Sequence, residues 1–181
     1  MANYYYFASS LPSLYMDRES QITYEEFMKR AKDQMSAKDY SDLEEITFRP
    51  SGEKAKLSLV REWESLVYRI NEILTEERAK KLGLDDKEYK ARCLPDKVIE
   101  DRVKHILDMP NPLEAERAIL NLYFDFLSEH ETSDPFSTKA LMIYSLKLQI
   151  KEKAAGFDRD KGKKEFDRLF GDVKKDIFHK E

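Results

Sequence analysis

Apolar side chains recur at three- and four-residue steps along most of the chain, with charged residues between them. The longest such stripe runs through the segment 54–82, where the apolar positions are Val60, Trp63, Val67, Ile70 and Leu74. This spacing places them on one face of an α-helix. Gly83 follows this segment, and glycine is typical of the position just after a helix. We therefore predict one long helix over 54–82.

Start and stop signals predict the other helices. Thr23 and Ser36 stand at capping positions, where a hydroxyl accepts a hydrogen bond from a free main-chain N–H group. Asn111-Pro112 and Asp134-Pro135 each place a capping residue before a proline, which suits the first turn of a helix. The predicted helices span 24–35, 37–46, a short segment from 85 or 86 to 91, 95–108, 113–128, 136–155 and 163–178.

Signals for β-structure are sparse. Only Tyr4–Phe7 has a composition that favours a strand. In the predicted helix 136–155, one line carries Leu141, Tyr144, Leu148 and Lys151. We expect an all-α bundle of seven or eight helices that forms a single domain over 1–181. Two packed lobes, 1–94 and 95–181, are the alternative organisation.

Composition and charge exclude several classes of protein. Of the 181 residues, 38% are charged, and the formal net charge is −4. No apolar run approaches the roughly 20 residues of a membrane span, and no secretory signal pattern opens the chain. The single cysteine, Cys93, indicates a reducing compartment. Near-balanced charge does not favour a nucleic-acid partner. We expect a cytoplasmic protein that binds no nucleic acid and does not insert into a membrane.

Residues with potential chemistry are few and scattered. Asp101 and His105 stand four residues apart on a predicted helix and could share a metal ion, and His130 lies between two glutamates. Cys93 has cationic neighbours that could activate its thiol. None of these has a visible ligand set or catalytic base. We expect a protein without catalytic activity, metal or cofactor. A small helical enzyme that uses Asp101, His105 or Cys93 is the alternative.

Two aromatic-rich segments are candidate protein-binding sites, because aromatic side chains are enriched at interfaces. The first is the run Tyr4, Tyr5, Tyr6 and Phe7. The second is the predicted last helix, where Phe166, Phe170 and Ile177 share a face. Packing within the core is the alternative interpretation of both segments.

Two stretches resemble a known family. The segment 3–12, which reads NYYYFASSLP, and the segment 23–27, which reads TYEEF, resemble small bacterial proteins encoded in operons of V-type (archaeal-type) ATPases. That family has no assigned activity. A weaker resemblance links Asp134-Pro135-Phe136, followed by Lys147, Lys151 and Glu152, to the all-helical C subunit of these ATPases. The chain is shorter than a C subunit and lacks its threefold lobe repetition.

These resemblances imply a non-catalytic subunit or accessory protein of a bacterial V-type ATPase. Such a protein would lie in the stalk that links the catalytic head to the proton- or sodium-transporting rotor. Its partners would be the ATPase subunits, and the complex would hold it at the cytoplasmic side of the inner membrane. The alternative within the same complex is a substoichiometric assembly or regulatory factor.

Overall fold

The computed structural model describes residues 4–50, 57–84, 89, 96–157, 168 and 170. Within these residues every regular element is a helix, which confirms the all-α prediction. Seven helices are described: α1 (Tyr5–Ser9), α2 (Tyr24–Gln34), α3 (Ala37–Glu44), α4 (Ser58–Lys81), α6 (Lys97–Leu107), α7 (Pro112–Glu129) and α8 (Thr138–Ala155).

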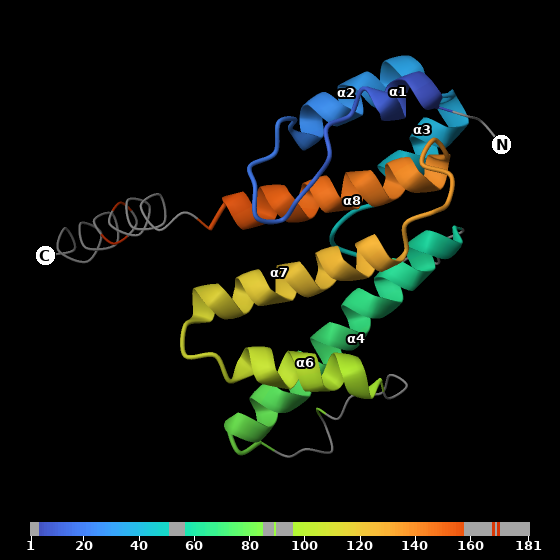
Figure 1. Cartoon of the computed structure of the whole chain (residues 1–181). Helices are drawn as coiled ribbons and strands as arrows, with labels where there is room; N and C mark the ends of the chain where they lie inside the picture. Colours follow the sequence, from blue (N-terminus) through green and yellow to red (C-terminus); the bar gives the residue numbers. More distant parts are fainter. Residues whose placement is uncertain are drawn as a thin grey trace, which may run out of the picture.

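Helix α8 lies in the middle of the bundle. It packs against α7 on one side and against α2 and α3 on the other (Figure 1). Beyond α7, helices α4 and α6 pack against each other. A helix that is covered on several sides needs buried side chains around much of its circumference. Accordingly, α8 buries nine residues: Leu141, Met142, Ile143, Ser145, Leu146, Lys147, Leu148, Ile150 and Lys151.

One connected core joins the two halves of the sequence, from Tyr4 to Ile150. Two groups of aromatic rings contribute to it. Phe27 stacks on Phe7 with ring centroids 5.6 Å apart and also contacts Tyr144. Trp63 contacts Tyr123 at 5.3 Å, and both rings contact the ring of a third residue, Phe48. Buried aromatic area of this kind contributes strongly to stability.

The predicted helix starts hold at three places. The Thr23 hydroxyl accepts from the main-chain N–H of Glu26 at 3.1 Å, and Ser36 caps α3 in the same way. Asn111 caps α7 with Pro112 in its first turn. The start predicted at 95 was wrong by two residues, because Asp96 caps α6 and the helix begins at Lys97. The glycine predicted to end α4, Gly83, has a φ of +67°, a backbone conformation that only glycine adopts readily.

The predicted start of the last described helix was wrong by two residues. Asp134 accepts a hydrogen bond from the main-chain N–H of Phe136 and so forms a turn before the helix. Ser137 is the true cap of α8, because its hydroxyl accepts from the main-chain N–H of Ala140. The helices predicted over 85–91 and 163–178 lie outside the described residues, except for Tyr89, Arg168 and Phe170, which are helical.

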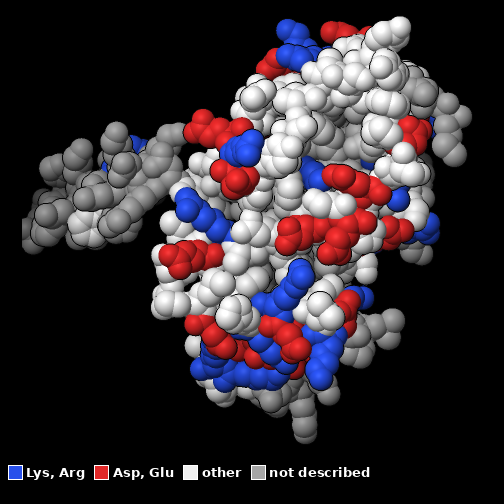
Figure 2. Space-filling view, in the orientation of Figure 1, with Lys and Arg blue, Asp and Glu red and all other residues white. Residues whose placement is uncertain are grey.

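The surface is unevenly charged. Charged side chains crowd the lower part of the molecule in Figure 2, around α4 and α6, whereas the upper right part toward α1 is mostly uncharged. None of the described helices combines the length and the apolar character that crossing a membrane would require.

Candidate interaction surface

The four consecutive aromatic residues at the start of the described chain divide into two pairs. Tyr4 and Phe7 are buried, with exposed fractions of 9% and 1%. Tyr5 and Tyr6 lie on the opposite side of this short segment, with exposed fractions of 54% and 86%. Tyr4 and Phe7 lie three residues apart and therefore share one side of this turn, whereas Tyr5 and Tyr6 are the two positions between them and remain exposed. One pair therefore anchors the segment and the other is presented at the surface.

The buried pair fixes α1 to three other elements. The main-chain N–H of Tyr4 donates to the carbonyl of Phe136, just before α8, at 2.9 Å. The Tyr4 hydroxyl donates to the carboxylate of Asp39 in α3. The Phe7 ring stacks on Phe27 of α2. Helix α1 has only five residues, so these tertiary contacts hold it in place rather than its own helical propensity.

The exposed pair also makes ring contacts along the surface. The ring of Tyr5 lies 4.7 Å from that of Phe136 and 5.6 Å from that of Tyr6, both measured between centroids. The second of these contacts is edge-to-face, the arrangement that aromatic pairs prefer. Tyr6 is consequently held by its neighbour while most of its own ring remains exposed.

A segment without regular structure, residues 11–23, connects α1 to α2, and side chains of α8 fasten it. The Tyr144 hydroxyl donates to the carbonyl of Pro12 at 2.9 Å. Lys151 donates to the carbonyls of Tyr15 and Arg18. We call this segment the strap. Long connections without regular structure are commonly functional, and this one is fixed at several points rather than loose.

Lys151 is the most unusual residue beneath the strap. It is a lysine with an exposed fraction of only 7%, and its ammonium group is enclosed by main-chain carbonyls. Burial lowers the pKa of Lys151, and the nearby carboxylate of Asp17 opposes that effect. It also lines a surface hollow of about 720 Å³ between the strap and the ends of α7 and α8. Its hydrogen bonds hold the middle of the strap against α8.

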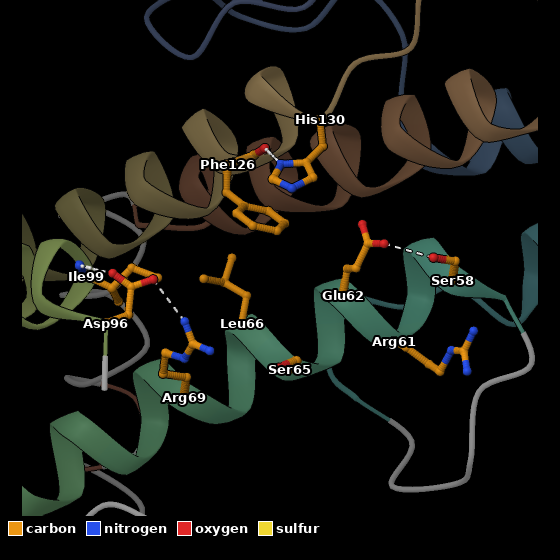
Figure 3. A pocket seen from close by; sticks show the side chains of 10 residues that line it. All are labelled: Ser58, Arg61, Glu62, Ser65, Leu66, Arg69, Asp96, Ile99, Phe126 and His130. Carbon is orange, nitrogen blue, oxygen red and sulfur yellow. Dashed lines mark hydrogen bonds and ion pairs between the residues drawn. The ribbon is translucent and has the colours of Figure 1, made fainter. Parts of the chain in front are cut away.

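A second hollow, of about 400 Å³, lies between α4, α6 and α7 (Figure 3). Its floor includes Leu66 and Phe126. At one side Arg69 forms an ion pair with Asp96, with 2.9 Å between Nη1 and Oδ2. At the other side His130 stacks on Phe126, and its Nδ1 lies 2.8 Å from the carbonyl of the same residue. Of the interactions drawn, the ion pair between Arg69 and Asp96 joins two helices, whereas the Ser58 hydroxyl donates to the Glu62 carboxylate at 2.8 Å within α4.

The residues considered for metal or nucleophilic chemistry do not come together in the described chain. Asp101 and His105 are both exposed on α6. No group of three or more potential ligands that could hold a metal ion occurs in the described segments. Cys93 lies outside them, as do Phe166 and Ile177 of the second aromatic candidate.

Phe170, the remaining member of the second aromatic candidate, is described as helical with an exposed fraction of 60%. The structure therefore presents three of the predicted interaction residues at the surface and buries two. It also exposes further aromatic residues, among them Tyr15 of the strap, at 52%. The sequence contained a signal for the fastening of the strap, because Lys151 interrupts an otherwise apolar line on its helix.

Comparison of the chain with protein-family models, with curated proteins and with solved structures found no match.

Proposed function

We propose that this protein is a non-catalytic subunit or accessory protein of a bacterial V-type ATPase, and that it docks on that complex through α1. The expected position is the stalk between the catalytic head and the membrane rotor. The observation that carries the proposal is the exposure of Tyr6, at 86%, on a helix whose opposite side is fixed in the core. The same segment carries the most specific part of the family resemblance.

Tyr5 and Tyr6 suit a docking site because the structure already holds them in place before a partner binds. Binding normally costs conformational entropy when interface side chains and loops become fixed. Here α1 is already held by Tyr4 and Phe7, and Tyr5 already packs on Phe136. A partner that covers these rings gains apolar burial at a reduced entropic cost. Tyrosine is accordingly among the residues that dominate interface energies.

The architecture also suits a mechanical role. A stalk component holds two assemblies in register, and hydrolysis takes place in other subunits. Helix α8 is covered on two sides, and the strap is fastened to it by side-chain hydrogen bonds. Close-packed helices of this kind transmit strain with little deformation.

The test is quantitative capture of the ATPase from the cells that make this protein. A tagged chain should co-purify with the ATPase subunits at a fixed ratio. The variant Tyr6→Ser should reduce recovery at least about tenfold, as expected for an interface hot spot. Tyr68→Ser is the matched control, because Tyr68 lies on α4 with a similarly high exposed fraction of 62%. Equal recovery of the two variants would contradict docking through α1.

The same measurement separates a subunit from an assembly factor. A subunit is present at a constant ratio in the active complex. An assembly factor is recovered with incomplete complexes and at a low ratio with the mature one. An ATPase that is complete and coupled in cells lacking this protein would exclude a required structural role.

A further inference from the structure

The first sixteen residues contain no charged side chain, although 38% of the whole chain is charged. The first charges are Asp17, Arg18 and Glu19, which follow one another. In the described part, this neutral segment comprises α1 and the first half of the strap. The strap part of this segment is held against α8 through Tyr144 and Lys151.

The outward positions of this segment are tyrosines and serines. Tyr5, Tyr6 and Tyr15 are more than half exposed, and Ser9, Ser10 and Ser13 are exposed as well. Ser9 follows Tyr5 by four residues and Tyr6 by three, so it lies beside both on the helix. Surfaces of tyrosine and serine combine large, stiff contact area with adaptable hydrogen bonding, as binding loops of antibodies do. We call this set of six residues the neutral face.

The lysine beneath the neutral face does not add charge to it. Lys151 directs its ammonium group to the carbonyls of Tyr15 and Arg18, and only 7% of the residue is exposed. At the end of the segment, the guanidinium of Arg18 lies over the ring of Tyr15, 5.0 Å from its centroid. Along the chain, the charged residues therefore begin where this segment ends.

We infer that the partner surface opposite the neutral face is itself uncharged, and is formed by apolar and hydroxyl or amide side chains of an ATPase subunit. This inference rests on the proposed function for the identity of the partner. A charged group pressed against the neutral face would lose its water without gaining a counter-ion, which is costly. An uncharged surface loses little and gains aromatic contacts and hydrogen bonds to the serines.

The first test is the response of binding to salt and to added charge. Binding to ATPase purified from cells lacking this protein should change by less than about twofold up to about 1 M NaCl, where charges are screened within about 3 Å. Ser9→Lys and Ser9→Glu should both weaken binding at least about tenfold, because neither charge finds a counter-ion. Ser41→Lys and Ser41→Glu are the controls on α3, where the serine is also exposed. Opposite effects of the two Ser9 variants would overturn the inference.

A second test separates the chemistry of the partner from its identity. A photo-crosslinking phenylalanine analogue at position 6 should capture an uncharged segment of an ATPase subunit in cells, whereas the same analogue at position 68 should not. Capture of an uncharged segment of a different protein would support the neutral partner and contradict the proposed function. Capture of a charged segment of an ATPase subunit would support the proposed function and contradict the neutral partner. Absence of a crosslink at position 6, at normal abundance of the protein, would contradict both.

Discussion

The hydroxyl of Tyr4 bonds to the carboxylate of Asp39 at 2.5 Å, across 35 residues of sequence. The same hydroxyl accepts from the main-chain N–H of Ser36 at 3.2 Å. Ser36 and Asp39 also bond to each other, since the Ser36 hydroxyl caps α3. One phenol from the start of the chain therefore completes the first turn of a helix that belongs to a different part of the fold.

Removal of this hydroxyl should destabilise the protein. Tyr4→Phe keeps the buried ring but leaves Asp39 and the N–H of Ser36 without this partner, and we expect a loss of about 1–3 kcal/mol in the free energy of unfolding. Urea denaturation followed by circular dichroism measures it. Tyr6→Phe removes an exposed hydroxyl and should stay within about 0.5 kcal/mol of the parent protein. Equal stability of the two variants would show that the Tyr4 bonds contribute nothing net.

Features that depend on neighbouring residues could be predicted from the sequence. The caps at Thr23, Ser36 and Asn111 are of this kind, because the acceptor and donor lie within three residues of each other. The cap of α8 was misassigned for a local reason too. Asp134 and Ser137 are both capable caps, and the sequence does not reveal that the first one closes a preceding turn.

The division of the aromatic run could not be predicted. Which of Tyr4, Tyr5, Tyr6 and Phe7 face inward depends on Asp39, Phe27 and Phe136, three residues brought together only by the fold. The β-favouring composition of this run was overridden because burial of two rings outweighs local propensity. Lys151 carried a partial signal, since a lysine on an apolar line requires an unusual partner, but its acceptors lie more than 130 residues away.

The end of α4 offers a test of backbone strain alone. Gly83 has a φ of +67°, and a Cβ built on it would meet no atom within 4 Å. Gly83→Ala should therefore lower the free energy of unfolding by about 1 kcal/mol through the left-handed conformation only. Gly83→Asn should cost less, because asparagine tolerates this conformation better. Urea denaturation of both variants measures these free energies of unfolding. A larger loss of stability for Gly83→Asn than for Gly83→Ala would contradict an effect of the left-handed conformation alone.

Alkaline pH should weaken the attachment of the strap through Tyr144. Burial raises the pKa of Tyr144 to about 12, and the Arg30 guanidinium opposes part of that effect. Because the folded state holds this proton more tightly than the unfolded state, the associated stability is present below about pH 10 and is lost as the pH rises through about 12. In Tyr144→Phe, the free energy of unfolding should fall less steeply over this window. In a spectrophotometric titration, Tyr144→Phe should also lack one tyrosine that ionises at high pH. The control variant Tyr68→Phe should still contain that tyrosine.

The ion pair between Arg69 of α4 and Asp96, the cap of α6, should couple the effects of substitutions at these two residues. Asp96 caps α6 with one carboxylate oxygen and pairs with Arg69 through the other. Within the described residues, Nε of Arg69 is buried without a hydrogen-bond partner, so this arginine is only partly satisfied even in the parent protein. Asp96→Asn keeps a capping oxygen but leaves the guanidinium without its counter-charge.

We expect Asp96→Asn to lower the free energy of unfolding by about 1–2 kcal/mol, because an arginine with a partly buried side chain is left unpaired. Arg69→Met should cost less, since it also removes the unpartnered Nε. In the double variant the loss should be smaller than the sum of the single losses by about 0.5–1 kcal/mol, which is the coupling between the two residues. A complete cycle of urea denaturation measures this term. Strict additivity would mean that Asp96 stabilises the protein as a helix cap alone, and that the contact between α4 and α6 depends on apolar packing around Leu66 and Ile99.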